Sequence, residues 1–283
     1  MGLAKRTDAV NDDPMTDTEA HQIDADLVGQ MIGHVGTDGF GSALDAALRC
    51  VVQFDLTAIM AYPASQCPTL LHDGLANVSD PGAMDAYLTG TYLLDAVYTA
   101  CKNRIAEGLY RLSDVAPDAF FEGDYYNSPH VHPCISLETG ALAEEIAYVI
   151  VLQGGTYVTY SLMRSNGRAS FSADEILRLA AYGPIVRAAV QRNWLQWVSP
   201  GLLDSGAGPT EVAFRSFAAD LLSPREQDIV GLILLGHSSA SVGLNLGIAE
   251  WTVKNHRKHI HAKLGISSQA ELFALFLRHL RKT

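Results

Sequence analysis

Long apolar runs are missing from this sequence, although 48% of its 283 residues are hydrophobic. A membrane-spanning helix needs about 20 consecutive apolar residues, and no stretch of the chain approaches that length. The first twenty residues are polar and acidic, without the apolar core of a signal peptide. We therefore expect a protein that stays in the cytoplasm and has no membrane partner.

Cysteine is scarce, and the signatures of several enzyme classes are absent. The four cysteines are well separated and form no CxxC pair, which favours buried small apolar side chains over disulfides: Cys50, Cys67, Cys101 and Cys134. The chain has no GxxxxGKS/T phosphate-binding loop and no acidic pair and central Asp of a phosphorylated receiver domain. The segment GFGSA around Ser42 does not match the GxSxG of a serine hydrolase. An enzyme is therefore the least favoured class, and no cofactor is predicted.

Charge is distributed unevenly along the chain. Only 18% of the residues are charged, and the net charge is −11. From Leu221 to the end, eight basic and four acidic residues give +4, whereas the rest of the chain carries 12 basic and 27 acidic residues, or −15. A small basic module on an acidic body is the asymmetry expected when only one end of a protein meets phosphate.

The amino-terminal part mixes helical and strand periodicity. Apolar residues at helical spacing predict helices at Phe40–Val52 and Met84–Glu107, and Asp55–Tyr62 has the composition of a strand. Two β-prone runs, Ile146–Leu152 and Tyr157–Arg164, are joined by Gln-Gly-Gly-Thr and predict a hairpin. The pattern is that of one sensor-sized domain of the α/β (α+β) class.

The domain boundaries follow from capping and linker residues. Ser172 and Glu175 form a capping box that begins a long helix running towards Trp197. Glycine and proline are frequent in residues 199–219, which predicts a linker. We therefore expect a disordered tail at 1–22, a sensory and dimerisation domain at 23–198, and a separate module at 220–283.

The carboxy-terminal module has the pattern of four short helices. The first begins at Ser223 with proline in the next position, and the second, Ser239–Leu246, ends at Gly247. The third spans Ala249–Leu264 and has a basic face, and the fourth spans Ser268–Leu280. Two short helices joined by a tight turn, the second of them basic, are typical of a helix-turn-helix, whose second helix enters the major groove of DNA.

Residues 221–280 resemble the LuxR-type helix-turn-helix. The resemblance lies in SPRE at 223–226, LGI at 246–248, TVKNH at 252–256 and AKLGI at 262–266. It implies an all-α, four-helix domain that binds double-stranded DNA, with these DNA-contacting residues: Thr252, Lys254, Asn255, His256, Arg257 and Lys258. Lys254, Asn255 and Lys258 stand where that family reaches base edges, and the others stand at or near phosphate.

Other interpretations of this module stay open. A basic helix face can simply be solvated. His256, His259 and His261 do not share one helix face, which argues against a metal site. Trp251 is expected to pack rather than to stack on a base. Gly243 weakens the second helix by about 1 kcal/mol relative to alanine, and this helix lacks the charged residues that the family often carries there, so its phosphate contacts are left undecided.

The amino-terminal domain resembles, in pattern, the GAF, PAS and autoinducer-binding sensory domains. It lacks the Trp that autoinducer-binding domains place with a Tyr ahead of an Asp, which argues against a standard acyl-homoserine lactone receptor. A small-molecule pocket is predicted from side chains that combine apolar surface with a polar group: Tyr87, Tyr92, Asp95, Tyr98, Tyr125 and Tyr148. Taken singly, each tyrosine is more often an ordinary core or surface residue.

His130, His132 and Cys134 have the side-chain types of a zinc site. The prolines around them indicate a loop, and no fourth ligand is visible in the sequence. No metal is therefore predicted.

Together these features predict a sequence-specific DNA-binding transcription regulator. We expect a homodimer that responds to a small-molecule effector or a partner through its amino-terminal domain. The alternative, from another class, is an interaction protein that binds and inhibits another regulator without reading DNA itself.

Overall fold

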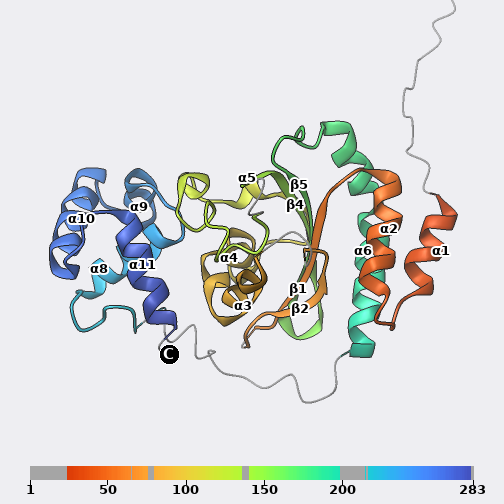
Figure 1. Cartoon of the computed structure of the whole chain (residues 1–283), viewed down its shortest axis with the longest axis horizontal. Coiled ribbons are helices and arrows are strands. Elements are labelled where there is room, and N and C mark those ends of the chain that lie inside the picture. The colour runs from red at the N-terminus through yellow and green to blue at the C-terminus, as the bar shows by residue number, and fades with distance from the viewer. Residues whose placement is uncertain are drawn as a thin grey trace, which may run out of the picture.

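The computed structural model describes residues 24–64, 66–75, 80–135, 140–197, 214 and 216–281. The tail predicted at 1–22 and most of the predicted linker lie outside the described residues. Figure 1 shows the described part as a sheet with helices on both faces, followed by a separate group of helices at one end. This is the expected α/β domain with an all-α domain after it, so the predicted fold class is confirmed.

The sheet of the first domain is antiparallel throughout and has the strand order β2-β1-β5-β4-β3. The strands are β1 (Leu56–Tyr62), β2 (Thr69–Asp73), β3 (Gly108–Arg111), β4 (Leu142–Val151) and β5 (Tyr157–Ser165). The predicted hairpin is the β4–β5 pair, and Gly154 at its turn takes a φ of 80°. Because side chains alternate along a strand, each central strand contributes to two separate cores.

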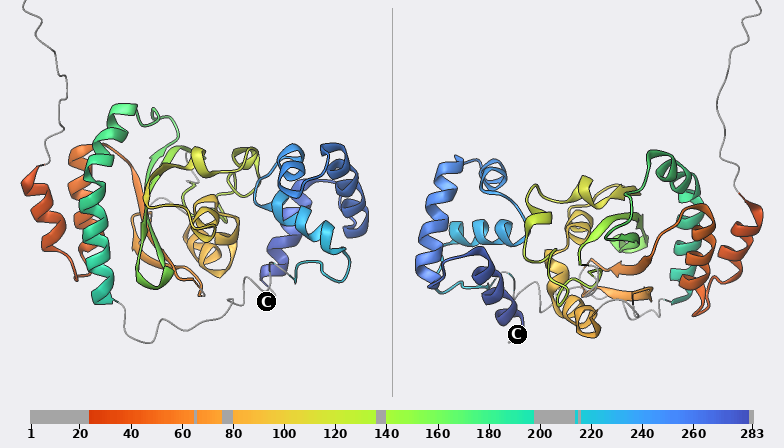
Figure 2. Two further views of the ribbon diagram at one scale, coloured as in Figure 1. Left: turned by 180° about the vertical axis from the view of Figure 1, so that it is seen from behind. Right: turned by 45° about the horizontal axis from the view of Figure 1, so that its top comes forward.

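Helices cover both faces of the sheet (Figure 1). One face carries α1 (Ala25–Gly33), α2 (Phe40–Val51) and α6 (Ala173–Trp197), which bury Ile146, Tyr148 and Ile150 of β4. The other face carries shorter segments: α3 (Pro81–Thr89), η1 (Thr91–Leu94), α4 (Ala96–Lys102), α5 (Leu112–Val115) and η2 (Phe120–Glu122). The two views in Figure 2 show α1 and the carboxy-terminal helices at opposite ends of the molecule.

One predicted helix is interrupted. The segment Met84–Glu107 forms α3, η1 and α4 rather than one helix. Asp95 explains the break, because its carboxylate accepts hydrogen bonds from Val97 N at 2.7 Å and Tyr98 N at 3.4 Å and so begins a new helix.

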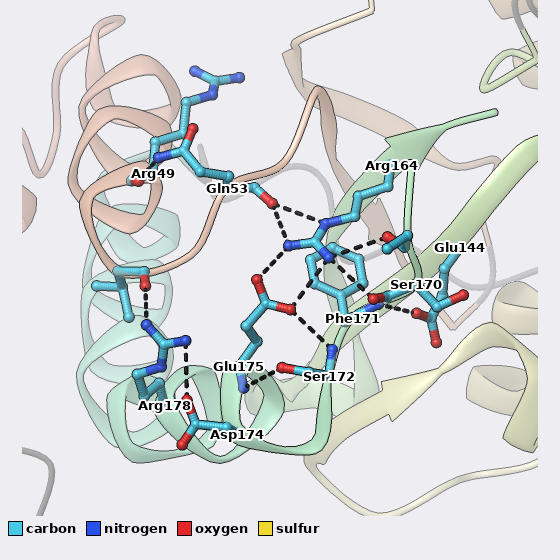
Figure 3. A network of polar contacts seen from close by, with 12 residues as sticks. Arg49, Gln53, Glu144, Arg164, Ser170, Phe171, Ser172, Asp174, Glu175 and Arg178 are labelled. Carbon is cyan, nitrogen blue, oxygen red and sulfur yellow. Dashed lines mark hydrogen bonds and ion pairs between the residues drawn. The ribbon is translucent and has the colours of Figure 1, made fainter. Parts of the chain in front are cut away.

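The start of α6 is fixed by a polar network (Figure 3). Ser172 and Glu175 exchange the hydrogen bonds of the predicted capping box, at 2.9 and 3.2 Å. Arg164 from β5 binds Glu175 at 2.5 Å, donates to the Gln53 carbonyl at 3.0 and 2.9 Å, and stacks 4.1 Å from the ring centre of Phe171. This network ties β5, the end of α2 and the start of α6 to one another.

The carboxy-terminal unit contains α8 (Pro224–Leu234), α9 (Ser239–Leu246), α10 (Glu250–Leu264) and α11 (Gln269–Leu280). Its boundary differs from the predicted one. The rings of Phe214 and Phe217, which the sequence placed in the linker, lie 5.3 and 5.4 Å from the ring of Phe276 on α11. The core of this unit therefore includes residues that precede position 220.

Candidate nucleic-acid interface and sensor cavity

The helix-turn-helix is built from caps that the sequence indicated. Ser223 and Glu226 form a capping box at the start of α8. Gly247 ends α9 and Gly265 ends α10, with φ values of 64° and 65°. These left-handed positions favour glycine because it has no Cβ, and they turn the chain sharply between consecutive helices.

Gly243, which weakens α9 by its low helix propensity, has a packing role. A Cβ atom at this position would lie 2.7 Å from the carbonyl oxygen of Ile248. Glycine therefore allows α9 to approach the start of α10 closely. Gly243 therefore allows the close packing of α9 and α10, and the lower helix propensity of glycine accompanies this packing.

The predicted DNA-contacting residues lie along α10, but their surroundings differ. Lys254 and Lys258 are exposed, whereas Thr252, Asn255 and His256 are half-buried. Lys254 Nζ lies 2.7 Å from Glu250 Oε1, one turn earlier on the same helix. A cationic surface is thus displayed on α10, whose apolar side chains Val253 and Ile260 are buried in the core.

Arg257 does not point freely to solvent. Its guanidinium donates to Ser239 Oγ at 3.1 Å and to Gln269 Oε1 at 3.2 Å, so it connects α9 and α11. Burial lowers the pKa of Arg257 from its usual value. The structure therefore gives this residue a bridging role within the helix-turn-helix, and its contact with phosphate stays a prediction.

Trp251 also differs from expectation. It was predicted to pack, but 71% of its surface is exposed at the start of α10. Leu244 on α9 is 85% exposed. Two large apolar side chains of the helix-turn-helix are therefore available to a binding partner.

A small internal cavity lies between the sheet and the segments on its second face. Its volume is about 30 Å³, and its lining includes Tyr62, Tyr87, Asp95, Phe120 and Glu145. This volume holds one or two water molecules. We call it the sensor cavity.

A hydrogen-bonded relay runs along one side of the sensor cavity. Tyr87 Oη donates to Asp95 Oδ2 at 2.7 Å, and the hydroxyls of Tyr62 and Tyr87 are 2.8 Å apart. The ring centroid of Tyr98 lies 5.2 Å from that of Tyr62, and the centroid of Tyr92 lies 6.3 Å from that of Tyr87 and 4.9 Å from that of Tyr98. The Tyr125 hydroxyl is buried and has no hydrogen-bond partner within the described residues.

Five of the six residues predicted for the pocket therefore gather on one face of the sheet. Tyr148 is the exception. It lies on the opposite face, where its hydroxyl donates to the carbonyl of Leu179 at 2.7 Å and its ring stacks on Tyr160. Tyr148 does not share a pocket with the other five, because alternation along β4 turns this side chain towards α6.

Two titratable residues that line the sensor cavity, Glu145 and His132, were not predicted for it from the sequence. Burial and the charge of Asp95 raise the pKa of Glu145 to about 8, against a hydrogen bond from Ser161 that lowers it. Burial lowers the pKa of His132 to about 3, so this ring is neutral at pH 7. The signal for Glu145 was available, because it shares its strand face with Ala147 and Val149.

The titration of Glu145 predicts a pH-dependent stability. The carboxyl ionises near pH 4.5 in the unfolded chain but near pH 8 in the fold. The stability linked to Glu145 is therefore complete below pH 4.5 and is lost as the pH rises to 8. In chemical denaturation, the stability of the wild type relative to Glu145→Gln should fall by roughly 2–4 kcal/mol across this range. A constant difference would contradict the buried, protonated state.

His130, His132 and Cys134 do not converge. His130 Nδ1 lies 2.9 Å from Asp80 Oδ2 at the surface, whereas His132 is buried and its Nδ1 accepts from Cys134 N at 3.2 Å. Across the described ranges, no group of three His, Cys, Asp or Glu side chains is placed to hold a metal ion. Within the same ranges, no helix is long and apolar enough to cross a membrane.

Known proteins resemble both parts of the chain. Residues 220–276 match the model of the family described as bacterial regulatory proteins, luxR family. An HTH-type transcriptional regulator from the exeN 3′ region of Aeromonas salmonicida is 37% identical over 145 residues, which cover 48% of this chain and 74% of that protein. The transcriptional regulatory protein MctR of Rhizobium johnstonii is 44% identical over 61 residues, 22% of this chain and 28% of MctR.

A solved structure resembles the first domain. The LBD domain of VqsR from Pseudomonas aeruginosa superposes with a TM-score of 0.51 at 23% identity, covering 60% of this chain and 96% of that one. This similarity shows a shared fold. The matched helix-turn-helix and the similar regulator from Aeromonas salmonicida lead to one conclusion: the chain belongs to the luxR family of bacterial regulatory proteins.

Proposed function

We propose that this transcription regulator acts as a homodimer, reads its operator through α10, and responds to a small molecule that enlarges the sensor cavity when it binds there. The observation that carries the proposal is the cationic surface of α10 on a capped helix-turn-helix. In this proposal Lys254, Asn255 and Lys258 contact base edges. Thr252, His256 and Arg257 contact phosphate or lie near it.

A genomic binding experiment tests DNA reading. Purified full-length protein is mixed with sheared genomic DNA, bound fragments are sequenced, and the selected sites are footprinted. Protection of defined inverted repeats, with half-sites about one helical turn apart, is the expected result.

The alternative is a protein that inhibits another regulator. The exposed Trp251 and Leu244 are the observation in its favour, because exposed large apolar side chains often mark protein contacts. Capture of another transcription regulator from a cell lysate, together with no enrichment of any DNA fragment in the genomic experiment, would favour this alternative.

The lining of the sensor cavity restricts the chemistry of the effector. Among the described residues, the side chains that line the cavity include two carboxyl groups, Asp95 and Glu145, and no Lys or Arg. An anionic effector would leave its charge unpaired beside these groups. We propose a small neutral or cationic molecule that donates hydrogen bonds. Mass spectrometry of the denatured, freshly purified protein should detect it.

The dimer is proposed to form along α6. Leu177 and Leu195 are 62% and 60% exposed, and Pro184 and Ala188 between them are exposed as well. The spacings of seven, four and seven residues place these side chains on one stripe of the helix, as in a coiled-coil seam. Two copies packed through this stripe would bury apolar surface that the monomer exposes.

The double variant Leu177→Asp/Leu195→Asp is expected to be monomeric in light scattering at concentrations where the wild type is dimeric. The substitutions put charges at the seam, where burial is costly. The control is Leu221→Asp, which alters a similarly exposed leucine outside α6. A dimer that survives the double substitution would place the interface elsewhere.

A further inference from the structure

One segment of the sensor domain is docked on the helix-turn-helix. We call this segment, Pro117–Tyr126, the strap. The backbone N–H of Ala119 donates to the carbonyl of Gly236 at 3.0 Å. Ser238 N donates to Asp118 Oδ1 at 2.9 Å, and Ser238 Oγ donates to the other carboxylate oxygen. Both partners lie in the turn between α8 and α9.

The docking is also a close-packed apolar contact. Phe120 is buried and belongs to a hydrophobic cluster that continues into Ile233 and Phe273 of the helix-turn-helix. Gly236 has a φ of 93°, and a Cβ atom there would lie 2.7 Å from the Cα of Phe120. The void left between the two units is only about 10 Å³. Glycine at 236 therefore permits a backbone approach that a side chain would prevent.

The docked position coincides with a place where DNA is expected. In a helix-turn-helix, the first helix lies against the DNA backbone, and helix N-termini bind phosphate through free N–H groups and the helix dipole. That first helix is α9, and Ser238 is its N-cap residue. Figure 1 shows the α9 region facing the sensor domain, with α10 on the outer side.

The strap is negatively charged, as DNA is. Its acidic residues are Asp118, Glu122 and Asp124, and its sequence contains no Lys, Arg or His. Partial desolvation acts to raise the pKa of Asp118, but the hydrogen bonds from Ser238 outweigh it and the pKa lies below its usual value. An ionised carboxylate therefore stays at the start of α9.

We propose that the strap is an autoinhibitory element in which Asp118 takes the place of a DNA phosphate at the start of α9. Docking of the strap and binding of DNA are then mutually exclusive. This inference rests on the proposed DNA-reading function and adds its regulation. Phe120 links the strap to the effector site, because the same side chain lines the sensor cavity and packs on Gly236. In this proposal, an effector larger than the cavity displaces Phe120 and with it the strap.

The variant Asp118→Asn tests the strap in the full-length protein. Loss of the carboxylate charge weakens docking, so the affinity for a selected DNA site should rise about three- to tenfold. The matched control is Asp114→Asn, which removes the same charge from exposed Asp114 on the neighbouring α5. The control should bind DNA as the wild type does.

The outcomes distinguish a failure of the strap proposal from a failure of the proposed DNA-reading function. Equal, measurable affinities for DNA in the wild type and both variants would overturn only the proposal that the strap is autoinhibitory. Absence of specific binding by all three proteins would overturn the proposed function as well.

Amide hydrogen exchange gives a second readout. The Ala119 N–H is protected in the docked state by its hydrogen bond to Gly236. Addition of the selected DNA should speed exchange in the peptide that contains Ala119 while slowing it in α10. Unchanged protection of that peptide in the DNA complex would contradict the proposal.

Discussion

Replacing Lys254 and Lys258 together by alanine should lower the affinity for the preferred DNA site by about 2–6 kcal/mol, because each lysine is assigned a base contact worth about 1–3 kcal/mol. Both side chains are exposed on α10. Their removal should therefore leave the melting temperature almost unchanged, apart from the small loss of the Glu250–Lys254 pair. Fluorescence anisotropy with a labelled operator measures the affinity.

Arg281→Ala provides the control for this experiment. It removes a cation from the exposed residue that follows α11 and should have little effect on site preference. Affinity of the double variant equal to that of the wild type would remove α10 from the DNA interface.

Arg164→Ala should have the largest effect on stability. The Arg164 and Glu175 side chains are 8% and 20% exposed, so the substitution leaves a poorly solvated carboxylate without its cation. Loss of one partner of a buried ion pair costs about 3–5 kcal/mol. We expect a decrease of that size in the free energy of unfolding at pH 7, measured by urea denaturation.

The cost of Arg164→Ala should depend on pH. Hydrogen bonds from Arg164, with smaller contributions from Ser172, lower the pKa of Glu175 to about 2 from 4.5. The stabilisation linked to Glu175 is therefore complete above pH 4.5 and is lost as the pH falls towards 2.

The surface pair between Arg168 and Asp55 supplies the control. Arg168 is 55% exposed, and Arg168→Ala should cost at most about 1 kcal/mol. Equal costs for the two arginines would show that the network in Figure 3 does not anchor α6.

The carboxy-terminal helices could be predicted from the sequence because their ends are encoded locally. Ser223, Ser268, Gly247 and Gly265 act through hydrogen bonds and φ values that involve only a few neighbouring residues. The same holds for the capping box of Ser172 and Glu175. Local patterns of this kind are visible without knowledge of the tertiary fold.

Features that depend on long-range contacts were missed or misassigned. Tyr148 was grouped with the pocket residues because the sequence alone did not show which face of the sheet its side chain occupies. That face is set by the pairing of β4 in the sheet. The bridging hydrogen bonds of Arg257 were not foreseen, because their acceptors come from two other helices. The docking of Asp118 on Ser238 joins residues 120 positions apart, and no local pattern indicates such a pair.

The central claim is that α10 distinguishes bases. The most direct test is a base-pair substitution scan of a selected site, with affinities measured for the wild type and for Lys258→Ala. We predict that the variant loses the preference at one position in each half-site, by about 1–3 kcal/mol, and keeps the preference at the other positions. Identical preference profiles for the two proteins, or a uniform loss at every position, would contradict base reading by Lys258.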